Sequence, residues 1–328
     1  MDHRILGRTG RTVSVVSLGT WQLGGDWGEV PTGDARAVLD AAVESGVTLF
    51  DTADVYGDGR SEQLIGAYLA DNPGHGIFVA TKMGRRVAQE PRNYTLANFR
   101  AWIDRSRSNL RVDTLDLVQL HCPPTAVFES DEVFDGLDTL VEEGALAHYG
   151  VSVETAEQAL IAIGRPRVAT VQIILNAFRL KPLDAVLPAA REAGVGILAR
   201  VPLASGLLSG KYTAQTTFAA NDHRSFNRHG EAFDVGETFS GVDFDRGVEA
   251  AHEFAALAKA EGLEPATAAL AWVAQLDGVS TVIPGARNPA QAHANAGAGE
   301  VPPLSAAFGT GVRAIYDEYF RAAIHERW

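Results

Sequence analysis

Residues able to move a proton stand at the ends of three successive apolar runs. LFD ends on Asp51 and is followed closely by Tyr56, IFVATK ends on Lys82, and LDLVQLH ends on His121. A phenol has a pKa of about 10 and is a poor proton donor unless its anion is stabilised. We expect a Lys82 ammonium beside Tyr56 to lower the phenol pKa, while Asp51 holds that ammonium in place.

This group suits the reduction of a carbonyl. Hydride arriving at a carbonyl carbon leaves negative charge on oxygen, which a phenol and a histidine can stabilise and protonate. The sequence therefore predicts Asp51, Tyr56, Lys82 and His121 as catalytic residues, with Tyr56 as the general acid. Trp21, Tyr56 and His121 are expected to line the substrate pocket. No metal site is expected, because no group of His and carboxylate residues shows ligand spacing.

The elements that must position these residues form a regular pattern. Strand-like runs near 16–18, 48–51, 77–82, 115–121, 148–152, 170–174, 196–200 and 281–284 alternate with segments of helical spacing. Such a pattern predicts a (β/α)8 TIM barrel, whose active sites lie at the C-terminal ends of the strands. A hairpin over 4–6 and 13–16 is expected to plug the bottom of the barrel, and Ser61 is expected to be the N-cap of a helix.

Composition favours one domain over residues 1–328, since 46% of the residues are hydrophobic and no low-complexity tract interrupts the chain. The net charge of −13 argues against nucleic acid or an anionic membrane as a partner, so a small molecule is the expected ligand. The single cysteine excludes an intramolecular disulfide, and the charged N-terminus lacks the apolar core of a signal peptide. We therefore expect a cytoplasmic protein; the sequence carries no indication of its oligomeric state.

The stretch 212–242 is irregular and far longer than an ordinary connection, which predicts a functional flap or binding loop. Several arginines lie in this and other loops, namely Arg85, Arg86, Arg92, Arg224 and Arg228. They would favour a polar or anionic carbonyl substrate if they face the barrel mouth. The simpler interpretation is that they are solvated.

The order of the motifs resembles that of the aldo-keto reductases, most closely the bacterial-type NADP-dependent oxidoreductases. The similarity covers nearly the whole chain and rests on SLGTWQLGG, DTADVYGDGRSE, ATKMG, DLVQLHCPP, YGVSV, VPLASGLLSGK and VIPGARNPAQAHAN. The resemblance implies reversible, NADPH-dependent reduction of an aldehyde or ketone to an alcohol. Hydride would come from the nicotinamide and the proton from Tyr56.

No GxGxxG follows a strand, so the sequence does not support a Rossmann dinucleotide site. The cofactor is therefore inferred from the same resemblance. Ser152 and Gln172 match the positions that hold the carboxamide, and the turn 202–211 matches the pyrophosphate loop. Arg287, just past the last strand, suits a 2′-phosphate, which favours NADPH over NADH. The residues expected to contact the cofactor are Gly19, Thr20, Trp21, Asp51, Ser152, Gln172, Arg200, Pro202, Leu203, Gly206, Leu208, Gly210, Lys211, Pro284, Gly285, Arg287, Gln291 and Asn295.

Two positions depart from the family pattern. Val153 stands where an Asn is frequent and cannot hydrogen-bond a carboxamide, and Arg200 stands where an aromatic residue is frequent. Arg200 could stack on a ring or contact a phosphate or an acidic substrate. Two other functions stay open: a Schiff-base enzyme using Lys82, and an NADPH-binding redox-sensing regulatory subunit with little turnover.

Overall fold

Eight parallel strands form the centre of the computed structural model, which describes residues 1–25, 30–74 and 76–328. The strands are β3 (Leu18–Gly19), β4 (Leu49–Asp51), β5 (Phe78–Met83), β6 (Leu115–His121), β7 (Leu146–Ser152), β8 (Val168–Ile174), β9 (Gly196–Arg200) and β10 (Thr281–Val282). Strands adjacent in sequence pair with each other, and parallel bridges from Val16 to Val282 and from Gly19 to Gly285 join the first strand to the last. The sheet is therefore closed, and the predicted (β/α)8 barrel is confirmed.

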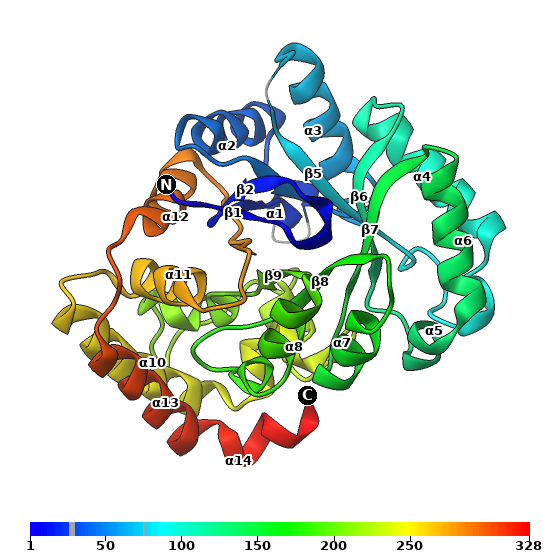
Figure 1. Cartoon of the computed structure of the whole chain (residues 1–328). Helices are drawn as coiled ribbons and strands as arrows, with labels where there is room; N and C mark the ends of the chain where they lie inside the picture. The colour runs from blue at the N-terminus through cyan, green and yellow to red at the C-terminus, as the bar shows by residue number, and fades with distance from the viewer. Residues whose placement is uncertain (26–29, 75) are drawn as a thin grey trace.

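Helices surround the strands (Figure 1). They are α1 (Trp21–Gly24), α2 (Thr32–Glu44), α3 (Arg60–Asp71), α4 (Leu96–Leu110), α5 (Thr125–Glu129), α6 (Asp131–Glu142), α7 (Ala156–Ile163), α8 (Val186–Ala193), α9 (His223–Phe226), α10 (Phe244–Ala260), α11 (Pro265–Gln275), α12 (Pro289–Gly297), α13 (Ala306–Tyr319) and α14 (Arg321–Ile324). The apolar face of α2 is buried: Val38, Leu39 and Ala42 are each at most 1% exposed. Helix α12 lies beside α2, so the C-terminal third of the chain completes the ring.

The N-terminal hairpin covers one end of the barrel. Strands β1 (His3–Ile5) and β2 (Thr12–Ser14) pair antiparallel, and the hairpin lies across the middle of the ring in Figure 1. Leu6 and Val13 are fully buried in a cluster with interior residues of the strands, namely Leu49, Phe78, Ala80, Leu117, Leu198 and Ile283. Because this apolar cluster includes the first residues of two strands, Leu49 and Phe78, the hairpin closes the end opposite the catalytic candidates.

The start of α3 differs from the sequence prediction. The helix begins at Arg60, and its N-cap is Gly59, with φ of 94°. Ser61 lies inside the helix and is fully buried; its hydroxyl donates to Thr20 Oγ1 at 2.8 Å and accepts from Thr52 Oγ1 at 2.9 Å. The prediction that Ser61 is the N-cap was wrong, because a left-handed glycine begins this helix and the hydroxyl serves a buried network instead.

Residues 212–242, called the flap below, are folded against the barrel mouth. The flap contains α9 and two short 3-10 helices, η5 (Val235–Glu237) and η6 (Phe239–Gly241). Asn227 is fully buried and its Oδ1 accepts the backbone N–H groups of Ala232 and Phe233, both at 2.9 Å. A side chain inside the loop thus supplies hydrogen bonds that a regular element would otherwise provide.

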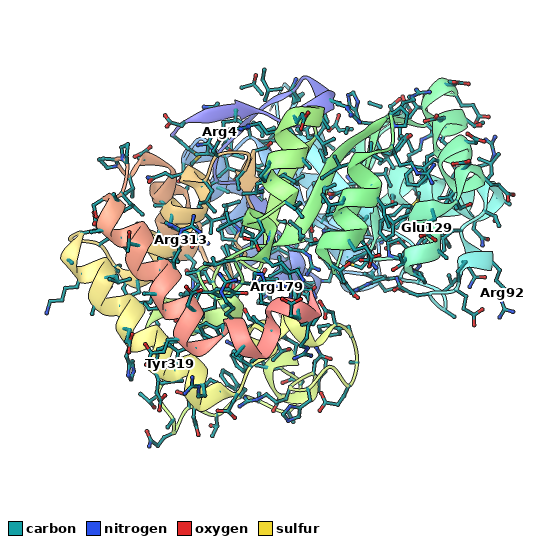
Figure 2. All side chains as sticks on the ribbon, turned by 60° about the horizontal axis from the view of Figure 1, so that its bottom comes forward. Arg4, Arg92, Glu129, Arg179, Arg313 and Tyr319 are labelled. Atoms are coloured by element: carbon teal, nitrogen blue, oxygen red, sulfur yellow. The ribbon has the colours of Figure 1, made fainter. Side chains whose placement is uncertain are left out.

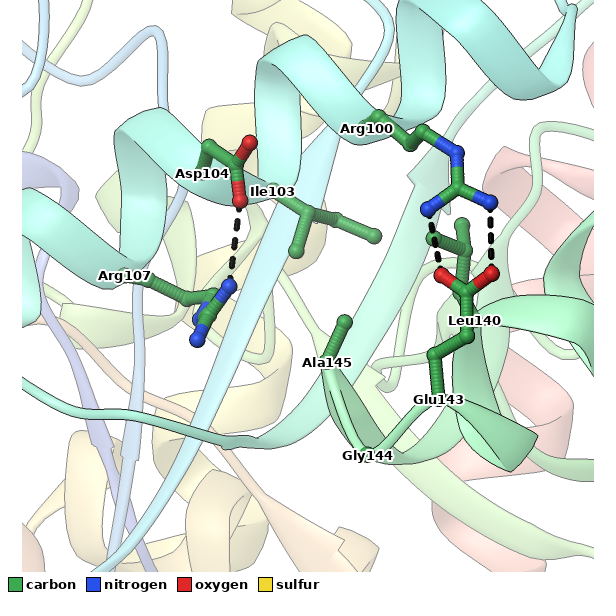
Figure 3. Close-up of a pocket in the computed structure, with 8 residues that line it drawn as sticks. All are labelled: Arg100, Ile103, Asp104, Arg107, Leu140, Glu143, Gly144 and Ala145. Carbon is green, nitrogen blue, oxygen red and sulfur yellow. Dashed lines mark hydrogen bonds and ion pairs between the residues drawn. The ribbon is translucent and has the colours of Figure 1, made fainter.

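Charged side chains cover the outside, where Arg92 lies at the edge of the molecule in Figure 2, whereas Arg179 lies toward the middle. A shallow cavity of about 170 Å³ between α4 and the end of α6 holds the surface ion pairs Arg100–Glu143 and Arg107–Asp104 (Figure 3). This cavity lies outside the barrel and contains none of the predicted site residues. Within the described part of the chain, every helix is too short or too polar to cross a bilayer.

Candidate active site

The four predicted catalytic side chains meet at the C-terminal ends of β4, β5 and β6. Lys82 Nζ lies 2.6 Å from Asp51 Oδ1 and 3.3 Å from the hydroxyl of Tyr56. Lys82 and Asp51 are 1% and 3% exposed. The ring of His121 stands edge-on to the ring of Tyr56, with 6.1 Å between centroids. Asp51, Lys82 and His121 lie at or next to the last residues of neighbouring parallel strands, which accounts for their convergence.

The electrostatics of Tyr56 differ from the sequence expectation. Burial raises the pKa of Tyr56 above its ordinary value, although the Lys82 ammonium acts in the opposite direction. The expectation of a lowered pKa was therefore wrong in its net direction, because removal of the phenolate from water outweighs the nearby charge. Burial also disfavours the Lys82 ammonium, but Asp51 and Tyr56 keep the pKa of Lys82 above its usual value. At neutral pH the phenol is protonated and the lysine is charged.

His121 is neutral at this site. Burial lowers the pKa of His121 well below its ordinary value, and the positive charges of Arg85, Lys82 and Arg200 lower it further. Its Nδ1 has no hydrogen-bond partner among the residues that the structure describes. Gln89 Nε2 donates to the His121 backbone carbonyl at 3.0 Å and so holds the end of β6. A neutral imidazole in this position can donate a hydrogen bond to a ligand oxygen.

The second oxygen of Asp51 is held by two amides. Gln172 Nε2 donates to Asp51 Oδ2 at 2.7 Å, and Gln119 Nε2 lies 3.4 Å from the same oxygen. Gln119 was absent from the predicted site; its place two residues before His121, on an apolar run, is the only signal that could have indicated it. Ser152 is 1% exposed and its Oγ lies 3.3 Å from Cys122 Sγ. The carboxamide contacts of Ser152 and Gln172 stay predictions.

One cavity of about 960 Å³ runs along the mouth of the barrel, at the upper end of the size range of ligand pockets. Most of the predicted cofactor residues line it: Gly19, Thr20, Trp21, Asp51, Gln172, Arg200, Pro202, Leu203, Gly206, Lys211, Pro284, Gly285, Arg287, Gln291 and Asn295. Ser152, Leu208 and Gly210 are not among the described residues that form its wall. No group of three or more His, Cys, Asp or Glu within the described ranges is arranged to hold a metal ion.

The far part of this cavity fits a dinucleotide. Ser205 and Gly206 have left-handed φ angles of 55° and 97°, and such turns orient backbone N–H groups toward anions. A Cβ on Gly206 would overlap the hydroxyl of Tyr212, so a side chain there would be strained by the left-handed φ and would require Tyr212 to move. Arg287 lies just before α12, and its backbone N–H donates to Gln291 Oε1 at 2.8 Å. Turn, cation and helix N-terminus suit phosphate groups along one extended ligand.

An aromatic wall stands beside Tyr56. The Trp21 ring lies 6.0 Å from the Tyr56 ring, 5.3 Å from His223 and 5.9 Å from Phe233, measured between centroids. Burial lowers the pKa of His223 to about 4, so this ring is neutral. His223 and Phe233 belong to the flap and were not predicted individually; their only signal was the presence of rings in a loop without strand or helix periodicity. Trp21 lines the cavity beside Tyr56, and its contact with substrate stays a prediction.

Acidic partners accompany most of the loop arginines. Arg85 Nη2 lies 3.2 Å from Glu154 Oε1, and Arg224 Nη2 lies 2.5 Å from Asp222 Oδ2. The remaining ion pairs are Arg86–Asp58, Arg92–Glu90 and Arg200–Glu237. Arg228 lies over the ring of Phe239 at 5.0 Å. Each of these arginines therefore has an acidic or aromatic neighbour within the described structure.

Comparison with known proteins agrees with this geometry. The model of the Aldo/keto reductase family matches residues 15–317. An uncharacterized oxidoreductase of Mycobacterium tuberculosis is 32% identical over 300 residues, which cover 88% of this chain and 85% of the relative.

Two solved structures extend the comparison. The glycerol dehydrogenase AKR11B4 from Gluconobacter oxydans superposes with a TM-score of 0.79 and 32% identity, over 97% of this chain and 95% of that one. An aldo/keto reductase from Klebsiella pneumoniae in complex with NADP and acetate shares the fold, with a TM-score of 0.71 and 21% identity over 96% of each chain. By its sequence, its barrel and its relatives, this chain belongs to the aldo/keto reductase family of oxidoreductases.

Proposed function

We propose that this protein reduces an aldehyde or ketone to an alcohol, reversibly, with NADPH as the hydride donor and Tyr56 as the proton donor. One observation carries the proposal: Lys82 Nζ bridges Asp51 Oδ1 at 2.6 Å and the Tyr56 hydroxyl at 3.3 Å. Asp51 and Tyr56 line a cavity of about 960 Å³ whose wall also includes Lys211, Arg287 and Asn295.

Each residue of the group has a separate task. The raised pKa of Tyr56 keeps its proton available, and the phenol donates that proton to the carbonyl oxygen. Lys82 stabilises the phenolate that remains, and Asp51 keeps Lys82 charged. Neutral His121 donates a hydrogen bond that orients the carbonyl oxygen. NADPH, when bound, supplies the hydride to the carbonyl carbon, so that the products are the alcohol and NADP⁺.

The choice of NADPH rests on the phosphate-binding part of the cavity. Arg287 and Lys211 line it, and an arginine fork binds a phosphate by charge-assisted hydrogen bonds. The NADP in the Klebsiella reductase is consistent with this choice. A Schiff-base role for Lys82 is disfavoured, because a charged lysine in a buried ion pair is a poor nucleophile.

The test is an equilibrium titration of NADPH and NADH by fluorescence, followed by a panel of aldehydes and ketones with the absorbance of the reduced nicotinamide as the readout. Arg287→Ala should weaken NADPH by at least about tenfold and leave NADH nearly unchanged, since a charge-assisted pair contributes about 1.5–3 kcal/mol. Arg313→Ala, on the exposed face of α13, is the matched control and should change neither affinity.

The possible outcomes separate the candidate functions. Tight NADPH binding with turnover supports the reductase. Tight binding without turnover of any carbonyl would favour the redox-sensing regulatory subunit, and equal losses of NADPH and NADH in Arg287→Ala would contradict the 2′-phosphate role.

A further inference from the structure

A buried ion pair joins the flap to the barrel rim. Arg200 is the last residue of β9 and Glu237 ends η5, and Nη1 of the arginine contacts Oε1 of the glutamate. The two residues are 7% and 9% exposed, and both line the cavity that contains Tyr56. Arg200 stands at a position where an aromatic residue is frequent in the family.

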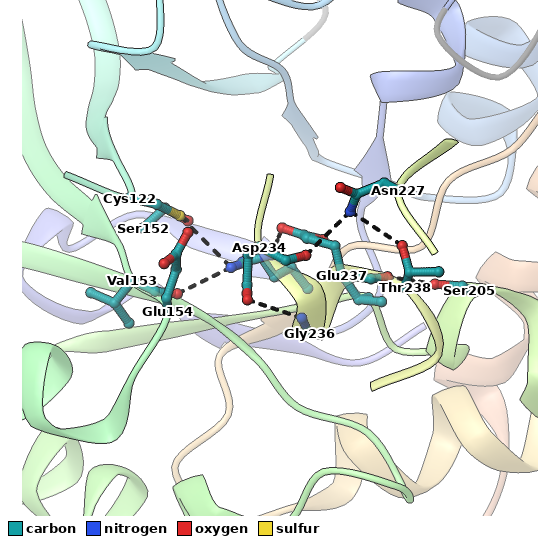
Figure 4. Close-up of polar contacts among 12 residues, drawn as sticks. Cys122, Ser152, Val153, Glu154, Ser205, Asn227, Asp234, Gly236, Glu237 and Thr238 are labelled. Atoms are coloured by element: carbon teal, nitrogen blue, oxygen red, sulfur yellow. Dashed lines mark hydrogen bonds and ion pairs between the residues drawn. The ribbon is translucent and has the colours of Figure 1, made fainter. Parts of the chain in front are cut away.

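The surroundings fix both members of the pair. Arg200 Nη2 donates to the Val153 carbonyl at 3.1 Å and lies 3.7 Å from Cys122 Sγ, next in the chain to His121. On the flap side, Ser205 Oγ donates to the Glu237 backbone carbonyl at 2.5 Å. Figure 4 draws Cys122, Val153, Ser205 and Glu237, the labelled partners in these contacts. The carboxylate is therefore held at one place beside the cavity.

Three cations gather at the reacting end, and each has its own acid: Lys82 with Asp51, Arg85 with Glu154, and Arg200 with Glu237. The last pair is close enough to act on the catalytic groups. The charge of Glu237 contributes to raising the pKa of Tyr56, and the charge of Arg200 contributes to lowering the pKa of His121.

The balance of charge between Arg200 and Glu237 matters for the charge of the bound cofactor. The inference rests on the proposed function. The nicotinamide ring is neutral in NADPH and carries one positive charge in NADP⁺. A buried guanidinium without a counterion would disfavour the charged form, because charges interact strongly where water is excluded. The reactive ring must lie beside Tyr56, which lines the same cavity as Arg200 and Glu237.

We propose that Glu237 is the counterion with which the flap balances Arg200, and that this pair sets the preference of the cofactor site between NADP⁺ and NADPH. With the pair intact, the cavity tolerates the charge that hydride transfer creates. The flap thereby determines which redox state of the cofactor is held more tightly.

Equilibrium binding tests the proposal without turnover. Glu237→Gln keeps the shape and removes the charge, so the ratio of the NADP⁺ to the NADPH dissociation constant should rise about tenfold, about 1.4 kcal/mol. Arg200→Gln should shift the ratio in the opposite direction, since it leaves the carboxylate uncompensated. The double variant is neutral again and should return to within about threefold of the wild-type ratio.

Glu90→Gln, which removes the acid partner of exposed Arg92, is the control and should leave the ratio unchanged. NADPH is titrated by fluorescence and NADP⁺ by competition, on proteins whose folding is checked by circular dichroism. If Glu237 only fastens the flap, both cofactors weaken by the same factor in each variant, and that result overturns the proposal. An unchanged ratio in both single variants also overturns the proposal. If one single variant fails to fold, the other still tests the direction in which the ratio of dissociation constants changes. Wild-type protein that binds neither cofactor would refute the proposed function instead.

Discussion

Asp54 is a buried carboxylate that the proposed chemistry does not use. It is fully buried, and neither carboxylate oxygen has a hydrogen-bond partner among the described residues. Burial and the nearby charge of Glu62 raise the pKa of Asp54 to about 7, although Arg86 and Arg105 act against this shift. Its position between Asp51 and Tyr56 makes it a measurable reporter of the active-site loop.

The expected effect is a pH-dependent stability. The folded pKa of Asp54 lies above the unfolded value of about 3.9, so the folded state binds the Asp54 proton more tightly than the unfolded state. The stability that this proton contributes is fully present below about pH 4 and is lost as pH rises through about 7. Asp54→Asn should remove this dependence. The free energy of unfolding of the variant minus that of the wild type should therefore increase by up to about 4 kcal/mol between pH 4 and 8. His121 and His223 titrate in both proteins and cancel in the difference. Urea unfolding at several pH values measures it, and parallel curves would refute the shift.

At the residue scale, sequence could predict the groups that a strand delivers. Asp51, Lys82 and His121 end apolar runs, and the rule that parallel strands end at one rim places them together. Glu154 and Glu237 could not be predicted as partners of arginines, because they lie in loops where no periodicity fixes the direction of a side chain.

At the scale of elements, the turn that carries Tyr56 depends on two glycines. Gly57 has φ of 58°, and a Cβ on it would overlap the carbonyl oxygen of Gly24 at the end of α1. Helix α1 begins with Trp21, whose ring packs on Tyr56. Gly57→Ala should therefore displace α1, reduce turnover, and destabilise the fold by more than the roughly 1–2 kcal/mol of left-handed strain alone.

Gly46, outside the turn that carries Tyr56, allows the effect of left-handed strain to be measured without the steric clash. Gly46 has φ of 83°, but a Cβ there would meet no heavy atom of the described residues within 4 Å. Gly46→Ala should cost only the strain and leave turnover unchanged. Steady-state kinetics and urea unfolding of both variants measure the difference, and similar effects in the two would contradict a role for the α1 contact.

Element boundaries show where local signals were sufficient. Strands β6 and β9 span the predicted residues 115–121 and 196–200, because apolar runs bounded by polar turns mark them clearly. The start of α3 was misplaced because a Ser followed by an acid resembles an N-cap, whereas Gly59 can adopt the left-handed conformation and Ser61 is drawn into buried contacts. The internal helices of the flap carried no periodic signal.

At the scale of the whole molecule, stability and chemistry lie at opposite ends of the barrel. The hairpin fills one end with Leu6 and Val13, and the other end carries Lys82 and the cavity under the flap. The alternation of strands and helices along the chain was enough to predict this architecture. The closure of the sheet through Gly19 and Gly285 depends on long-range pairing, which no local pattern encodes.

The most direct test of the account is the turnover of Tyr56→Phe with bound NADPH. The variant keeps the ring packing but has no proton to donate, so carbonyl reduction should fall at least about a hundredfold. The NADPH dissociation constant should stay within about twofold of the wild type. Tyr319→Phe on α13, outside the cavity, is the control and should be fully active. Turnover of Tyr56→Phe within about tenfold of the wild type would contradict Tyr56 as the proton donor.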